Sequence, residues 1–295
     1  MLIPNSWRNC ITAILQRPSS VLVIGEGTSG KTSFVTALAQ EGFRQGLKVA
    51  VLDMDIGQSN IGPPTTMGLG YIKTDFHFLS EIPAAHIYFV GHTSPIGKEI
   101  IFAEGLKNLI PRIEKVDLAV VESVAFFKDL DFRNKMLAFE TEIIRPYYIV
   151  VLKEHTLYQE KKTPEGGIVF SLPALVRRIK RNLGQRKRFR VESWKRYLRE
   201  GRTYSAIIPD NKSYSPSEVI GLPVGITDNK GNHLAVGIVY NATDSSFSIF
   251  APPLVKKGVG SRTSRIGPPR FSVIMGEVKV EGKVLNFIKA QVKEP

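Results

Sequence analysis

GEGTSGKT, residues 25–32, is a glycine-rich turn between the apolar run VLVI and a helix-like segment over about residues 31–45. The stretch fits G-x-x-x-x-G-K-[ST] in full, and the order strand, turn, helix is the context in which this pattern binds phosphate. Glycines let the backbone turn its N–H groups inward, and the helix adds its positive N-terminal end. A glycine turn with a chance lysine is the alternative. The stretch predicts a nucleotide-binding α/β domain.

The residue types of this turn divide into phosphate ligands and a metal ligand. Lys31 is expected to reach the β- and γ-phosphates, and the Thr32 hydroxyl to coordinate Mg²⁺. The motif identifies a nucleotide phosphate site and not a reaction. The predicted cofactor-binding residues are Gly25, Glu26, Gly27, Thr28, Ser29, Gly30, Lys31, Thr32 and Ser33.

Apolar, strand-like runs alternate with helix-like segments up to about residue 155. Continuous apolar strands separated by helices predict a doubly wound, mostly parallel sheet covered on both faces. The expected strands are 21–25, 48–53, 86–90, 117–121 and 147–152, and the expected helices are 31–45, 98–109 and 132–144.

The pattern changes in the last third of the chain. A helix-like and strongly basic stretch runs from about residue 173 to 199, and AVGIVYNATDSSFSIFAPP then alternates apolar and polar residues around a turn. Such alternation predicts antiparallel strands. We therefore predict a core domain over residues 1–200 and a smaller β-rich domain over residues 201–295, with the boundary near 200–215.

The composition indicates a globular protein with an anionic partner. Hydrophobic content is 43%, and the formal charge is +13 at pH 7. That charge favours nucleic acid or a membrane surface as the partner. The single cysteine, Cys10, excludes an internal disulfide framework. No apolar run is long enough to span a membrane and the N-terminus has no signal-peptide pattern, so we expect a cytoplasmic protein.

Two acids close the apolar run in VLDMDIGQSNIGPP, residues 51–64. Ligands of doubly wound sheets bind at the carboxyl ends of the strands, and side chains two residues apart on an extended chain point the same way. One of Asp53 and Asp55 could therefore hold Mg²⁺ while the other serves the phosphate acceptor. Solvated turn carboxylates are the alternative. The spacing leaves open whether the acceptor is water or a substrate hydroxyl.

The combination of GEGTSGKT, DMDIGQSNIGPPTTMGLG and FVGHTSPIGK resembles the polynucleotide 5′-hydroxyl kinase family, from about residue 21 to 197. The family includes the RNA kinases of tRNA splicing, pre-mRNA cleavage and ribosomal-RNA maturation. The resemblance implies a P-loop kinase core with a helical lid, and ATP, with GTP as the alternative, together with Mg²⁺. It also implies RNA or DNA with 5′-hydroxyl ends as the partner, and no membrane. Only about 20 residues precede the first strand, so the N-terminal β domain of eukaryotic relatives is not expected.

The resemblance also implies roles for single residues. Asp55 matches the general base for the 5′-hydroxyl, with Asp53 as a supporting acid near the metal, so the implied metal site comprises Thr32, Asp53 and Asp55. ESVAFF, residues 122–127, departs from the Asp/Asn-Thr, glycine and aromatic pattern of relatives. The implied substrate contacts are Gln58, the clasp-loop residues Thr93 and Ser94, and Phe126 as the aromatic that stacks on the terminal base. An ordinary capped turn and a core phenylalanine are the alternatives for the last three residues. His92, beside Thr93, is expected to be a solvated loop histidine.

The densest charge lies in VRRIKRNLGQRKRFRVESWKRYLR, residues 176–199. A solvated face or a nucleic-acid patch would explain it. The family places its lid here, at about residues 171–200, and Arg181 and Arg186 fall where two arginines reach the transferring phosphate. Arg188 is then expected to contact the substrate backbone. Gly184 interrupts the charged sequence and could break the helix.

The resulting hypothesis is an ATP-dependent polynucleotide 5′-hydroxyl kinase. Its catalytic residues would be Lys31, Asp55, Arg181 and Arg186. One alternative is a P-loop ATPase or GTPase switch, which would turn over with water alone. Another is a nucleotide-bound scaffold of an RNA-processing complex, although the intact motif residues count against a decayed site.

Overall fold

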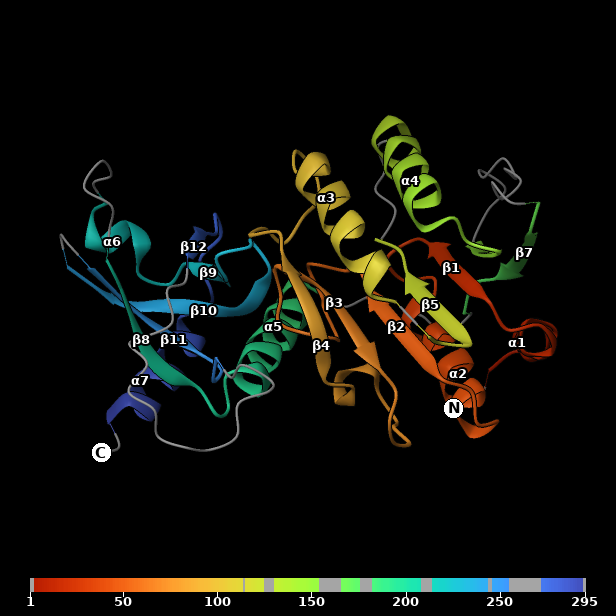
Figure 1. The fold of residues 1–295 in the computed structure, drawn as a ribbon, viewed down its shortest axis with the longest axis horizontal. Helices are drawn as coiled ribbons and strands as arrows, with labels where there is room; N and C mark the ends of the chain where they lie inside the picture. Colours follow the sequence, from red (N-terminus) through yellow and green to blue (C-terminus); the bar gives the residue numbers. More distant parts are fainter. Residues whose placement is uncertain are drawn as a thin grey trace.

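Two β-sheets frame the molecule (Figure 1). The computed structural model describes residues 3–113, 115–124, 130–153, 166–175, 182–207, 214–243, 246–254 and 272–293. The strand order of the larger sheet is β4-β3-β2-β5-β1-β6-β7, and that of the smaller sheet is β12-β9-β10-β11-β8. No helix within these ranges is both long and apolar enough to cross a membrane.

The larger sheet confirms the predicted mostly parallel core. Strands β2, β5, β1, β6 and β7 run parallel, whereas β3 and β4 are antiparallel additions at one edge. The bounds are β1 (Ser20–Gly25), β2 (Val49–Asp53), β3 (Thr66–Tyr71), β4 (Ala84–Phe89), β5 (Leu118–Glu122), β6 (Tyr148–Lys153) and β7 (Ile168–Pro173).

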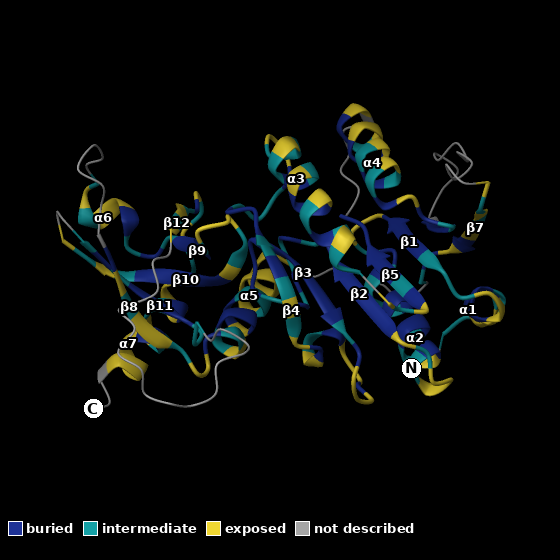
Figure 2. Cartoon of the chain, in the orientation of Figure 1, coloured by how far each residue is buried: buried dark blue, intermediate teal, exposed yellow. Residues whose placement is uncertain are grey.

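Helices cover both faces of this sheet, because successive side chains of its buried strands point to opposite sides. On β1, Val21 and Val23 pack with α1 and α2, whereas Leu22 and Ile24 pack with α3 and α4 (Figure 1). The bounds are α1 (Asn5–Gln16), α2 (Lys31–Arg44), α3 (Glu99–Leu109) and α4 (Leu130–Ile144), with short 3₁₀ turns at Leu79–Glu81 and Ile110–Arg112. Figure 2 shows the central strands as the most buried part of this layer.

Strand β3 is an element that the sequence pattern did not predict. Its sequence TMGLGY contains two glycines, and glycine is depleted in strands. Packing explains them, since a Cβ on Gly68 would lie 1.8 Å from the Ile61 carbonyl oxygen, and one on Gly70 would lie 2.6 Å from the Ile82 side chain. The loop before β3 therefore lies directly against the sheet.

The smaller sheet confirms the predicted antiparallel strands. It contains β8 (Arg202–Ile207), β9 (Pro223–Thr227), β10 (His233–Ala242), β11 (Ser246–Ala251) and β12 (Ser272–Met275), every neighbouring pair antiparallel. The short α6 (Pro216–Val219) and the longer α7 (Gly282–Lys293) accompany it.

Helix α5 (Leu183–Tyr197) lies between the two sheets (Figure 1). Trp194 and Val191 share one buried cluster with β4, β10 and α7. The helix is shorter than the predicted stretch, because β7 reaches Pro173 and a capping box between Asn182 and Gln185 starts the helix. Gly184 lies in the first turn of α5 and does not interrupt the helix, although the sequence suggested that it could.

Candidate functional site

The phosphate loop joins β1 to α2 as its motif predicts. Gly30 adopts a left-handed conformation (φ 96°) directly before the helix, which glycine allows without steric cost. The Lys31 ammonium group lies inside the loop, and its Nζ donates hydrogen bonds to the carbonyl oxygens of Gly25 (3.0 Å) and Glu26 (3.1 Å). Burial lowers the pKa of Lys31, and the nearby carboxylate of Glu122 opposes this shift. The Lys31 side chain is thereby held where a P-loop binds phosphate.

The neighbouring strand adds an acid that our sequence reasoning did not assign to the site. Glu122 ends β5, the strand between β1 and β2. Its Oε1 accepts a 2.6 Å hydrogen bond from the Thr32 hydroxyl, and the side chain is only 1% exposed. Burial and then the charge of Asp53 raise the pKa of Glu122 to about 8. The signal in the sequence was the acid at the end of DLAVVE, beside the phosphate-loop strand.

Asp53, the first of the two predicted acids, organises the loop that follows it. Its Oδ1 accepts the amide of Asp55 (3.0 Å), and its Oδ2 accepts the amides of Asn60 (2.6 Å) and Ile61 (3.2 Å). The side chain is fully buried, and burial followed by the charge of Asp55 raises its pKa to about 7. Its role near the metal stays a prediction.

Asp55, the second acid, is half-buried and oriented through one oxygen. Its Oδ1 accepts the amides of Gly57 (3.1 Å) and Gln58 (3.0 Å). The Gln58 side chain donates to the Gly57 carbonyl oxygen at 2.7 Å. A Cβ on Gly57 would lie 2.7 Å from the Thr93 carbonyl oxygen. Glycine is therefore required where the loop of Asp55, which we call the acceptor loop (residues 54–61), meets the clasp loop (residues 90–98).

The clasp loop carries Thr93 and Ser94 between β4 and α3, and both are half-buried. The His92 side chain stabilises the conformation of this loop, because His92 Nδ1 accepts a hydrogen bond from the Ser94 amide at 3.0 Å. Ser94 Oγ in turn accepts the amide of Ile96 at 3.3 Å. His92 is half-buried as well. It is therefore a part of the loop structure and not the solvated side chain that we expected.

These groups could hold a nucleotide-bound Mg²⁺. Among the described residues, no three histidine, cysteine or acidic side chains form a metal-binding group. Mg²⁺ needs none, since it is commonly held by one or two protein oxygens together with substrate phosphates and water. The Thr32 hydroxyl at the helix N-terminus and the acids at the adjacent strand ends supply such hard oxygen ligands.

The predicted lid residues are placed only in part. Arg181 and Phe126 lie outside the described residues. Arg186 and Arg188 lie in the exposed first half of α5. The second half of the helix is attached to the acceptor loop, because the Ser193 hydroxyl donates to the Ser59 carbonyl oxygen at 3.3 Å. The structure thus brings the acceptor and clasp loops together and places the second half of α5 against the acceptor loop.

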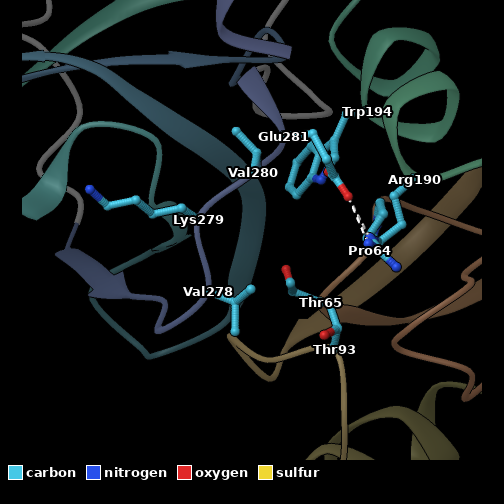
Figure 3. A pocket seen from close by; sticks show the side chains of 9 residues that line it. All are labelled: Pro64, Thr65, Thr93, Arg190, Trp194, Val278, Lys279, Val280 and Glu281. Carbon is cyan, nitrogen blue, oxygen red and sulfur yellow. Dashed lines mark hydrogen bonds and ion pairs between the residues drawn. The ribbon is translucent and has the colours of Figure 1, made fainter. Parts of the chain in front are cut away.

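A small cavity of about 60 Å³ lies beside the clasp loop, between α5 and the segment before α7 (Figure 3). Arg190 and Glu281 form an ion pair at 2.8 Å on its wall. Thr65 is buried there with φ 74°, a value that is unusual for a β-branched residue. The lining residues are Pro64, Thr65, Thr93, Arg190, Trp194, Val278, Lys279, Val280 and Glu281.

Known proteins resemble this chain in sequence and in fold. The chain is 34% identical to the polyribonucleotide 5′-hydroxyl-kinase of Methanocaldococcus jannaschii, over 64% of this chain and 53% of the relative. It is 28% identical to that of Thermococcus kodakarensis, over 74% and 62%. The chain therefore spans between about half and two thirds of the length of these relatives.

A solved structure described as the wild-type Clp1p–Pcf11p complex superposes with a TM-score of 0.68 at 11% identity, over 92% of this chain and 78% of that one. This likeness shows the fold. Residues 25–200 match the family described as mRNA cleavage and polyadenylation factor CLP1 P-loop. The matched range contains the phosphate, acceptor and clasp loops together with α5, and the chain belongs to this family.

Proposed function

We propose that the protein is an ATP-dependent polynucleotide 5′-hydroxyl kinase, which transfers the γ-phosphate to the 5′-hydroxyl end of RNA or DNA. The proposal rests on the contact between the acceptor and clasp loops at Gly57 and Thr93. This contact lies at the carboxyl ends of the strands, as does the phosphate loop. A hydrolytic switch needs only a water molecule as the phosphate acceptor at these strand ends. A clasp against the acceptor loop is suited to a larger substrate.

Phosphoryl transfer depends on positioning and on charge neutralisation more than on covalent chemistry. Lys31 would neutralise the β- and γ-phosphates from inside the loop. Thr32, with Asp53 and Asp55 nearby, would hold Mg²⁺, which would neutralise further phosphate charge. Asp55 would accept the proton of the 5′-hydroxyl. Two amides fix its Oδ1, which limits the rotation of the carboxylate.

The basic charge supports a polyanionic substrate. The net charge is +13, and the exposed half of α5 carries Arg186, Lys187 and Arg188. Gln58, Thr93, Ser94, Arg188 and Phe126 are the proposed substrate contacts, and Arg181 and Arg186 are the proposed ligands of the transferring phosphate. The names of the archaeal relatives support the same assignment, because both are called polyribonucleotide 5′-hydroxyl-kinases.

The test is nucleotide turnover with matched oligonucleotides. ATP or GTP labelled in the γ-phosphate is incubated with RNA or DNA that ends in either a 5′-hydroxyl or a 5′-phosphate. We expect label on 5′-hydroxyl oligonucleotides only, and Lys31→Ala should abolish it while the protein stays folded. Equal release of inorganic phosphate with either end, or with none, would instead identify a hydrolytic switch. Binding of nucleotide without turnover would identify a scaffold.

A further inference from the structure

The Trp7 side chain of α1 is hydrogen-bonded to the last residue of β7. Its Nε1 donates to the Pro173 carbonyl oxygen at 2.9 Å, and the side chain is fully buried. The indole also meets the Phe34 ring of α2 edge-on, with ring centroids 5.3 Å apart. A buried indole N–H needs an acceptor, so this bond fixes the end of β7 relative to α1. Trp7 precedes the range 25–200 that matches the family, and the motifs assign it no role.

The residues that follow β7 contact the phosphate loop. The Leu175 amide donates to the Ser29 carbonyl oxygen at 3.2 Å. Gly30 packs against the side chains of both Leu175 and Trp7, because a Cβ on Gly30 would lie 2.9 Å from Leu175 Cδ1 and 2.9 Å from Trp7 Cη2. Trp7 therefore holds the phosphate loop in two ways, by direct contact with Gly30 and through the residues that follow β7.

This packing determines where one amide of the phosphate loop points. The peptide group between Ser29 and Gly30 is planar and trans, so its C=O and N–H point in opposite directions. Because Leu175 binds the carbonyl oxygen, the Gly30 N–H is directed away from Leu175. Gly30 directly precedes α2, where the backbone N–H groups of a phosphate loop bind phosphate. A displacement of Leu175 would therefore turn a phosphate-binding group.

We propose that Trp7 is a positioning residue of the nucleotide site, which holds the peptide group after Ser29 through Leu175. It fixes in the same way the residues from which the basic stretch continues toward α5. The inference rests on the proposed function for the presence of a nucleotide, and it does not depend on transfer to an acceptor. Helix α1 thereby acquires a role in the site in addition to covering the sheet.

Trp7→Phe tests the proposal, because it keeps an aromatic ring but removes the N–H donor and reduces the contact with Gly30. Isothermal titration calorimetry measures the binding of ADP to the full chain, well below the thermal transition. We expect ADP affinity to fall about fivefold, an effect of the size of one lost hydrogen bond. Unchanged ADP affinity in a folded Trp7→Phe protein would overturn the proposal.

Ile14→Val is the matched control. Ile14 is a fully buried residue of the same helix and the same buried cluster as Trp7. It lies about 10 Å further along α1, toward Arg17, whose guanidinium donates to the Tyr147 hydroxyl at 2.9 Å beside the start of β6. The lost methyl group should lower the thermal transition while ADP affinity stays that of the wild type. An equal loss of ADP affinity in both variants would make the role of Trp7 merely structural and would overturn the proposal.

The fluorescence of Trp7 keeps the proposal testable if Trp7→Phe does not fold. The chain has two tryptophans, so Trp7 is the only one in Trp194→Phe. Bound phosphate adds negative charge beside Gly30, which contacts the indole ring. We expect ADP to change the emission of Trp7 with the midpoint of the calorimetric titration, and unchanged emission at saturating ADP would overturn the proposal.

These measurements separate the inference from the kinase assignment. No acceptor is present in them, so a protein that binds ADP but phosphorylates no oligonucleotide would still show the effect of Trp7→Phe. A wild-type protein that binds no ADP would refute the nucleotide site itself, and the inference with it.

Discussion

At the scale of single residues, the two acids that end β2 differ in what their oxygens already bind. The Asp53 carboxylate accepts three amides of the acceptor loop through both of its oxygens, whereas Asp55 accepts two amides through Oδ1 alone. Of the two, only Asp55 is partly accessible. This contrast assigns a loop-forming role to Asp53 and a chemical role to Asp55.

Asp55→Asn should lower kcat by about 10²–10⁴-fold with little change in KM for the oligonucleotide, because general bases contribute that much and act in the transition state. Asp53→Asn should instead raise the Mg²⁺ requirement and lower the free energy of unfolding by about 1–3 kcal/mol, since its new NH₂ group faces backbone donors. Parallel Mg²⁺ titrations and thermal melts of both variants check this. The reverse pattern would exchange the two roles.

Glu140 predicts how stability depends on pH. Burial raises its pKa to about 7 from an ordinary value of 4.5. The folded state therefore holds this proton more tightly than the unfolded state, so its contribution is complete below pH 4.5 and is lost as pH rises through about 7. Glu140→Gln should make the protein more stable than the wild type at pH 8, by about 1–3 kcal/mol. Urea unfolding at pH 5 and pH 8 checks this, and an equal difference at both values would contradict it.

At the scale of elements, α5 has two halves with different environments. Residues 182–188 are exposed, whereas Val191, Ser193 and Trp194 are buried against the acceptor loop and the smaller sheet. The exposed half is available for a phosphate backbone. The buried half fixes where that charge is presented.

Salt dependence tests this division of α5. Neutralising Lys187 and Arg188 to glutamine should flatten the slope of log affinity against log salt, by about 0.7 for each phosphate of a single strand that the helix no longer neutralises. Lys195→Gln is the control, because Lys195 lies on the same helix and pairs with Glu192 at 3.4 Å. Fluorescence anisotropy of a labelled oligonucleotide gives both slopes. An unchanged slope in the double variant would mean that the exposed half of α5 does not bind the phosphate backbone.

The sequence predicted elements where local chemistry decides the structure. The phosphate loop is recognisable because glycine, lysine and a hydroxyl are needed at fixed positions. Strand β3 was missed because the glycines that permit contact with Ile61 also weaken its strand pattern. Glu122 was underestimated because its bond to Thr32 joins residues 90 positions apart and depends on strand order. The pairing of strands that are far apart in the sequence cannot be predicted from the pattern of any single segment.

At the scale of the whole molecule, the two sheets meet at β4, which packs against β10 in a shared core. The amide of Glu277 donates to the Gly91 carbonyl oxygen at 3.0 Å, and the Phe89 amide donates to His233 Nδ1 at 3.3 Å. Both contacts adjoin the clasp loop. The domain that contains the smaller sheet therefore supports the clasp loop.

His233 should make this junction sensitive to acid. Burial, and then the charge of Arg112, lowers the pKa of His233 to about 4. Its neutral form accepts the Phe89 amide, so its contribution is present above pH 6.5 and is lost as pH falls through about 4. His233→Gln cannot titrate and should lose less stability than the wild type between pH 7 and pH 4.5. Chemical denaturation at both values checks this, and an equal loss in both proteins would contradict it.

The central claim is that phosphate is transferred to a 5′-oxygen, and the position of the label tests it most directly. An RNA with a 5′-hydroxyl is labelled from γ-labelled ATP and then digested to nucleoside 5′-monophosphates. We expect all of the label on the RNA to be recovered in the 5′-monophosphate of the first nucleotide, and Asp55→Asn to yield almost none. Label recovered only as inorganic phosphate, at the same rate in both proteins, would contradict it.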